Sequence, residues 1–381
     1  MTKNYPYRAL QQRLNEMPIG FPKTISGVEI RLLKRLFTDE QALIGVHMTF
    51  KPESASTIAA RFAESSTQIT DIEENLELMA RSGGIFRITR DGEYKYMLHP
   101  WLVGMFEIAS AQLIKDEKID LDFLDDNEKY VVQGFGLELA YSHRRGYREI
   151  PIEQAITPVH AVAAYDELQR IIEDCDGKMG VIPCVCKTSA KMHGKPCKQT
   201  SRLEVCMAFR DMAAVGIDQG VVRETSKAEM LEIARQSEAE GLVLQAENTQ
   251  NPNWICACCG DCCGLLRLFK IVPRAIDFVE SNYFSTIDEE KCVGCGTCAK
   301  RCPLGAIVVK NKKAHVNRNK CIGCGVCASK CGKKAARLEH KPLENVPPID
   351  YDALMEEIYQ HKKTAAQKAK LLVKALLRIK Q

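Results

Sequence analysis

The cysteines carry the clearest sign of chemistry in this 381-residue chain. Eight of its 18 cysteines lie in two similar runs, each spaced C-x2-C-x2-C-x3-C and offset by 29 residues. The runs contain Cys292, Cys295, Cys298 and Cys302, then Cys321, Cys324, Cys327 and Cys331. Thiolates suit soft transition metals, and two-residue gaps fold the chain into a tight loop whose sulfurs converge. The runs therefore predict two metal–sulfur sites.

Residues 284–340 resemble the bacterial ferredoxins that carry two [4Fe–4S] clusters, because all eight ligand positions are present. In that family the fourth cysteine of each run ligates the other cluster. The resemblance therefore implies two ligand sets, namely Cys292, Cys295, Cys298 and Cys331, and Cys321, Cys324, Cys327 and Cys302. Pro303 follows the first run but Gly332 follows the second, so we expect more solvent exposure at the cluster of Cys331. Zinc knuckles are the alternative interpretation.

Apart from Cys175, nine further cysteines precede these runs, and none of their spacings is a ferredoxin loop. They are Cys184, Cys186, Cys197, Cys206, Cys256, Cys258, Cys259, Cys262 and Cys263. We predict that they ligate metal as one or two further iron–sulfur clusters; zinc sites, or one cluster plus a redox-active thiol pair, are alternatives. Cys206 falls in a run, Leu203–Ala214, that we expect to be helical. We interpret Cys175 as a plain thiol.

The amino-terminal elements predict a winged-helix-like module over residues 1–105. Helices are expected at Val28–Phe37, Ser54–Glu64 and Thr67–Arg81, followed by two strands, Ile85–Ile88 and Tyr94–Leu98, around an Asp91-Gly92 turn. The third helix carries Asp71, Glu73, Glu74 and Glu77 against Arg81. DNA binding needs basic residues on that surface, so the charge argues against DNA and favours protein docking.

The remaining chain predicts an α+β multidomain protein. We expect a helical connector over 106–180, a mostly helical cysteine-rich middle over 181–283, the ferredoxin-like domain over 284–340 and a basic helical tail over 341–381. Ser226–Gly241 is a helix with a capping box. The basic helix Thr364–Lys380 fits peripheral contact with an anionic membrane, an acidic partner, or packing on its own protein. This order of parts is similar to that of uncharacterised multi-cysteine 4Fe–4S dicluster-domain proteins of anaerobes.

Composition restricts the possible environments. Apolar residues make up 45% of the chain, yet no stretch approaches the about 18 apolar residues of a membrane span. Met1–Gly20 lacks the apolar segment of an export signal. We therefore expect a cytoplasmic protein, where reducing conditions keep thiols available for metal. Residues 285–341 carry 13 Lys and Arg against 4 Asp and Glu, or +9, within a formal net charge of +4.

These observations favour an iron–sulfur electron-transfer protein, a one-electron carrier or a subunit of a larger oxidoreductase. Its potential is expected on the order of −400 mV if its clusters behave like low-potential ferredoxin clusters, and its partner is a redox protein such as an oxidoreductase or flavoprotein. One alternative is a redox-sensing winged-helix transcription regulator. Another is an oxidoreductase with a catalytic cluster or thiol pair within 184–263. The sequence contains no nucleotide-binding glycine loop.

Overall fold

The structure, a computed structural model, describes residues 5–63, 71–142, 144–156, 163, 166–364, 366–368 and 370. It divides into two units. The first comprises Met1–Ser142, Ala214–Arg223 and Ile358–Lys362; the second comprises His143–Ala213, Glu224–Glu357 and Lys363–Gln381. The predicted mixture of helix and sheet is confirmed. The five-part division of the chain stays a prediction.

The first unit is mainly helical. Its helices include α1 (Tyr5–Glu16), α2 (Val28–Leu36), α3 (Asp39–Val46), α4 (Ala55–Ala63), α5 (Ile72–Arg81), α6 (Phe106–Lys115), α7 (Leu121–Tyr130) and α8 (Gly136–Tyr141). Leu32, Leu33 and Leu36 give α2 a buried apolar face. A capping box starts α3, because the Thr38 hydroxyl accepts from the Gln41 N–H and the Gln41 side chain accepts from the Thr38 N–H.

A hairpin of β1 (Phe86–Arg90) and β2 (Glu93–Met97) completes the first unit. Its turn is the predicted Asp91-Gly92 pair, and both residues have positive φ, as a two-residue hairpin turn of this type requires. The expected helices at Val28–Phe37 and Ser54–Glu64 correspond to α2 and α4. Residues 64–70, which include the expected start of the third helix, lie outside the described residues. The winged-helix assignment itself stays a prediction.

The second unit is built on a six-stranded sheet with the order β3-β7-β8-β5-β4-β6. The strands are β3 (Tyr147–Ile150), β4 (Met179–Pro183), β5 (Glu204–Phe209), β6 (Arg223–Glu224), β7 (Val243–Glu247) and β8 (Trp254–Cys258). The expectation of a mostly helical middle was therefore wrong. Cys206 lies in β5, and α11 (Arg210–Asp218) begins only after it. The apolar run around Cys206 is short, and such runs do not distinguish strand from helix.

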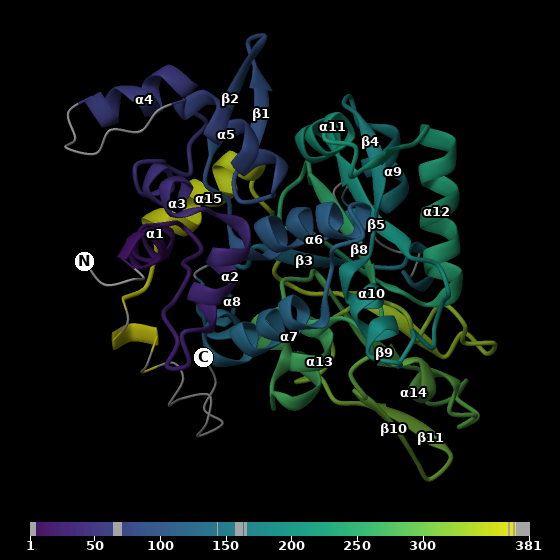
Figure 1. The fold of residues 1–381 in the computed structure, drawn as a ribbon. Helices are drawn as coiled ribbons and strands as arrows, with labels where there is room; N and C mark the ends of the chain where they lie inside the picture. Colours follow the sequence, from purple (N-terminus) through teal and green to yellow (C-terminus); the bar gives the residue numbers. More distant parts are fainter. Residues whose placement is uncertain are drawn as a thin grey trace. The chain divides into compact units, whose positions relative to one another are not determined.

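Helices α9 (Leu168–Glu173) and α12 (Lys227–Glu240) lie beside the sheet (Figure 1). Their buried residues, such as Ile171 and Ile233, form one core with Val205 and Ile255 of the strands. The helix predicted over Ser226–Gly241 is confirmed as α12, and Gly241 ends it in the left-handed conformation. Of the predicted capping box, the structure shows the Ser226 half, in which its side chain accepts from the Glu229 N–H. Because strand residues alternate between faces, the cysteines next to Val205 and Ile255 face away from these helices.

Two short antiparallel pairs form the ferredoxin-like part of the second unit. β9 (Tyr283–Ile287) pairs with β12 (Ala336–His340), and β10 (Ile307–Lys310) pairs with β11 (Lys313–Val316). Its short helix is α14 (Thr297–Arg301), and the β10–β11 hairpin projects from the rest of the unit (Figure 1). The remaining helices are α10 (Val185–Met192), α13 (Gly264–Ile271) and α15 (Tyr351–Gln360).

The basic tail falls mostly outside the structural description. Residues 365, 369 and 371–381 are not among the described residues, so the expected helix Thr364–Lys380 stays a prediction. Among the helices that are described, none has the length and apolar character required to cross a bilayer.

Candidate metal centres

Four cysteine side chains line one cavity, named here site A. They are Cys292, Cys295, Cys298 and Cys331. The first three come from the loop that enters α14, whereas the fourth comes from the second cysteine run. Backbone N–H groups point at two of the sulfurs: Ala314 donates to Cys292 Sγ at 3.4 Å and Ala336 donates to Cys331 Sγ at 3.4 Å. Such N–H···S contacts favour the thiolate form that metals bind.

A second cavity, site B, is lined by the other four cysteines. They are Cys302, Cys321, Cys324 and Cys327. Ser285 of β9 contacts two of them, because its N–H donates to Cys321 Sγ at 3.3 Å and its hydroxyl lies 3.3 Å from Cys327 Sγ. The Ala306 N–H donates to Cys302 Sγ at 3.1 Å. Each cavity therefore combines three sulfurs of one run with the last sulfur of the other.

The two cavities differ in their contact with solvent. Cys295 of site A is exposed, whereas Cys321, Cys324 and Cys327 of site B are buried. Burial raises the pKa of Cys327 to about 12. The Thr297 backbone N–H, with its hydroxyl, holds the pKa of Cys295 below the ordinary thiol value. The exposure of site A arises at Cys295, since Cys331 beside Gly332 is half-buried, like Cys302 beside Pro303.

Comparison with known proteins addresses this segment. Residues 274–338 match the family model of the 4Fe-4S dicluster domain. This segment is a ferredoxin-type dicluster domain. The match begins ten residues before the segment expected from the cysteine spacing, and the dicluster domain occupies only part of a larger chain.

Two known proteins are similar to this chain over short segments. An uncharacterized ferredoxin of Methanocaldococcus jannaschii is 55% identical over 29 residues, covering 8% of this chain and 19% of the ferredoxin. A component of the ion-translocating oxidoreductase complex of Magnetococcus marinus is 41% identical over 51 residues, covering 13% of this chain and 28% of that component. The chain thus aligns with less than a third of either relative. No solved structure gives a significant match.

Six cysteines outside the dicluster domain form a ring of neighbouring thiols, named here the six-thiol ring. In order around the ring they are Cys184, Cys186, Cys263, Cys258, Cys256 and Cys206. Each one shares a side-chain hydrogen bond with the next, and Cys206 closes the ring on Cys184. The hydrogen bond that Cys186 donates to Cys184, together with burial, raises the pKa of Cys186 to about 12.

The ring draws on four elements of the second unit. Cys256 and Cys258 lie two residues apart on β8, and Cys206 of β5 is directly opposite Cys256. Cys184 follows β4 and precedes α10, which carries Cys186 in its first turn. Cys263 directly precedes α13 and completes the ring. The strand alternation that buries apolar residues on one face therefore gathers sulfur on the other.

The other three middle cysteines form a separate group. The ligand atoms of Cys197, Cys259, Cys262 and Asp261 all lie within 4.8 Å of one another. The Cys197 and Cys259 sulfurs are 3.4 Å apart. Lys187, only 2% exposed, donates from Nζ to Cys259 Sγ at 3.2 Å. Three thiols, a carboxylate and an adjacent ammonium form a donor set that fits one metal ion or a redox-active thiol pair.

Some of these side chains were not found from sequence. The nine middle cysteines appear along the chain as groups of four and five, but the structure divides them into six and three. Lys187 directly follows Cys186, and a lysine beside a C-x-C pair is a signal that could have been used. Ser285 gave no signal, because its contacts with sulfur depend on β9 lying beside the second cysteine run. Cys175 is buried in the apolar core.

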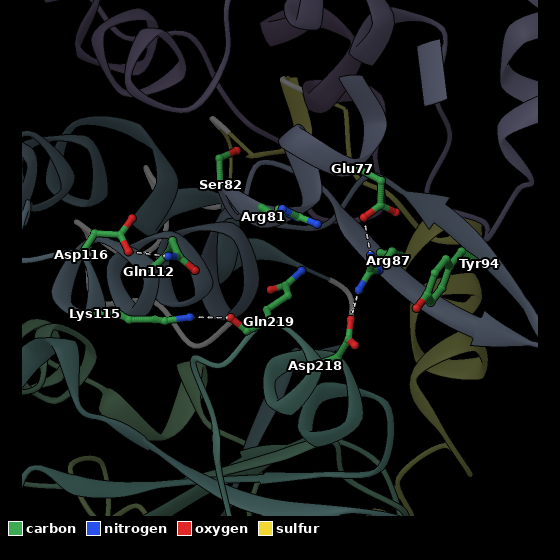
Figure 2. Close-up of a pocket in the computed structure, with 10 residues that line it drawn as sticks. All are labelled: Glu77, Arg81, Ser82, Arg87, Tyr94, Gln112, Lys115, Asp116, Asp218 and Gln219. Carbon is green, nitrogen blue, oxygen red and sulfur yellow. Dashed lines mark hydrogen bonds and ion pairs between the residues drawn. The ribbon is translucent and has the colours of Figure 1, made fainter. Parts of the chain in front are cut away.

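A pocket in the first unit lies among charged side chains rather than sulfur (Figure 2). Arg87, which is 6% exposed, forms ion pairs with Glu77 and Asp218 and lies over the Tyr94 ring at 4.2 Å. Lys115 donates to the Gln219 carbonyl at 2.9 Å. Among the described residues, no cysteine lines this pocket. The ion pairs of Arg87 with Glu77 and Asp218 are those expected of a structural network.

Proposed function

We propose that the chain is an iron–sulfur electron-transfer protein in which sites A and B each hold one [4Fe–4S] cluster. The observation that carries this proposal is the pair of separate four-thiol cavities, each supplied with N–H···S bonds. Bound there, such clusters supply one-electron redox chemistry at a potential on the order of −400 mV. The protein contributes the eight thiolates, their hydrogen bonds and the burial that tunes the potential.

Site A is the exchange point with a redox partner. Cys295 is exposed, and the exposed lysines Lys312 and Lys333 lie on the segments that border this cavity. Site B is more deeply buried and passes electrons inward. The similarity to a component of an oxidoreductase complex supports service to a larger redox assembly. We propose an oxidoreductase or a flavoprotein as the partner.

Iron and sulfide analysis of protein purified without oxygen tests the cluster assignment. Cys298→Ala in site A and Cys324→Ala in site B are each expected to lose about 4 iron atoms and one of the signals that dithionite produces in EPR. Cys175→Ala is the matched control, because that thiol lies in the apolar core. A colourless, zinc-filled protein without such signals would contradict the proposal.

A second candidate function is favoured by the three-thiol group. The 3.4 Å separation of the Cys197 and Cys259 sulfurs, with Lys187 beside them, fits a redox-active thiol pair of an oxidoreductase. Turnover of a disulfide substrate with an artificial electron donor, abolished by Cys197→Ser, would support this function. This function would be excluded if the unaltered protein showed no turnover of the disulfide and Cys197→Ser merely lost a bound metal. For DNA recognition, the exposed Asp71, Glu73 and Glu74 of the α5 segment have the wrong charge.

A further inference from the structure

Packing in an apolar core does not explain why six thiols lie together in the six-thiol ring. Cys184, Cys258 and Cys263 are each less than 9% exposed, and each ring member has two other ring sulfurs as hydrogen-bonding partners. A free thiol is a weak hydrogen-bond donor, so gathering six thiols, three of them buried and three half-buried, provides little stabilisation. Six neighbouring sulfurs are instead a ligand set that suits a soft metal.

A polar row connects the ring to site B across the sheet. Glu149 of β3 is opposite Gln245 of β7, Gln245 is opposite Cys256 of β8, and Cys256 is opposite Cys206 of β5. These four residues therefore project from the same face of the sheet. The Gln245 amide donates to Glu149 Oε1 at 2.9 Å, while its Oε1 accepts from Cys263 Sγ at 3.6 Å.

The far end of the row reaches the dicluster domain. Glu149 is fully buried. Burial, then the neighbouring Cys327 and then Glu149 raise the pKa of the Cys324 thiol in site B. The backbone also joins the two parts, because the Ile152 N–H donates to the Cys324 carbonyl at 3.2 Å. Gly325 packs so closely that an added Cβ would lie 2.8 Å from Ala155 Cβ. The ring and site B thus belong to one closely packed region.

We propose that the six-thiol ring binds a third iron–sulfur cluster, which exchanges single electrons with the cluster of site B across Gln245 and Glu149. In each exchange, site B loses one electron and is oxidised while the ring centre is reduced by that electron. A [4Fe–4S] cluster and a zinc ion each take four thiolates, so the number of sulfurs does not distinguish them. The polar row that leads from the ring to a buried redox site favours a redox-active occupant. The proposal adds a centre to the two clusters of the proposed function.

Metal analysis of the full chain purified without oxygen tests this inference. Two [4Fe–4S] clusters contribute about 8 iron atoms, so a third cluster raises the iron content clearly above that value. Cys206→Ala combined with Cys256→Ala removes two facing ring members and is expected to return iron to about 8 per chain. Cys175→Ala should keep the full content, and Cys324→Ala should lose the iron of site B alone.

Electron paramagnetic resonance tests the connection to site B. Magnetic coupling to a nearby reduced cluster should broaden the site B signal, and the double variant should sharpen it. An iron content of about 8 in the unaltered chain would overturn the third cluster while leaving the proposed function intact. Zinc in the ring, three disulfides found by mass spectrometry, or iron that persists in the folded double variant would overturn it too. A site B signal unchanged by the double variant would overturn the exchange of electrons.

Discussion

Ser285 is placed to tune the potential of the cluster that we propose for site B. Its N–H and hydroxyl both contact sulfurs of site B, at 3.3 Å in each case. A hydrogen bond to sulfur stabilises the more negative, reduced state of a bound cluster. Ser285→Ala removes the hydroxyl contact but retains the backbone one, so we expect the site B potential to fall by roughly 20–60 mV, the equivalent of one ordinary hydrogen bond in a one-electron couple.

Ser329 provides the matched control for this prediction. It lies in the same cysteine-rich segment, but its hydroxyl donates to the Val326 carbonyl at 3.2 Å rather than to sulfur. Ser329→Ala should leave both potentials unchanged in an EPR-monitored redox titration. Equal shifts in the two variants would show that the effect reflects general loosening of the segment rather than the Ser285–sulfur contact.

At this scale, the sequence predicts ligands better than their surroundings. The cysteine spacing named every thiol that lines sites A and B, because the short loops that gather three sulfurs are local in sequence. Gln245 and Glu149 are 96 residues apart, and their hydrogen bond exists only because β3 and β7 pair in one register. No local pattern encodes such a contact.

The first cysteine loop depends on two glycines that differ in their surroundings. Gly294 and Gly296 have φ values of 70° and 79°, which favour glycine equally. A Cβ on Gly294 would lie 2.4 Å from the Lys312 carbonyl oxygen, whereas a Cβ on Gly296 would meet only Val309, at 3.9 Å. The loop is therefore pressed against the β10–β11 turn at one glycine and open at the other.

Alanine substitution should separate these two effects. Gly296→Ala is expected to cost about 1–2 kcal/mol of stability through its backbone conformation alone. Gly294→Ala adds a collision with main-chain atoms that cannot rotate away, for about 1–3 kcal/mol more. We expect Gly294→Ala to release iron from site A at a lower temperature than Gly296→Ala, as followed by the loss of visible absorbance. Equal release temperatures would mean that the β10–β11 turn moves away from the added Cβ at no measurable cost in stability.

Among the elements, those with complete local signals were the predictable ones. The Asp91-Gly92 turn and α12, which lies between Ser226 and Gly241, have end signals within a few residues. The sheet of the second unit was missed because its strands are short and buried, so their apolar runs lack a clear period. Strand β12 was missed as well, since its pairing with β9 joins residues far apart in the sequence, such as Ala336 and Ile287.

At the scale of the whole molecule, charge is distributed unevenly along the chain. The segment 285–341 carries +9, although the chain carries only +4. The two [4Fe–4S] clusters that we propose would contribute about −2 each with their thiolates when oxidised. The segment would then keep a net positive charge, which attracts anions and repels cations. Lys312 and Lys333, both exposed, lie beside site A, where Cys295 is exposed. These positions place positive charge where we propose that electrons cross the surface.

Reversing these two charges should therefore change electron transfer according to the charge of the other reactant. With Lys312→Glu and Lys333→Glu combined, we expect oxidation of the reduced protein by ferricyanide, an anion, to slow by roughly tenfold at low salt. Oxidation by hexaamminecobalt(III), a cation, should accelerate. Both effects should shrink as salt rises, because charges separated by more than about 10 Å are screened at 0.1 M.

Stopped-flow absorbance of the cluster-loaded protein measures these rates. A pair of reversals at Lys118 and Lys34, which belong to the first unit and line neither site A nor site B, makes the same change in net charge. If this control pair slows ferricyanide as much as the Lys312 and Lys333 pair does, only net charge matters and site A has no special role. If the local pair acts more strongly and in opposite directions on the two oxidants, electrons leave the molecule at site A, because the field near the exposed cluster then determines the rate.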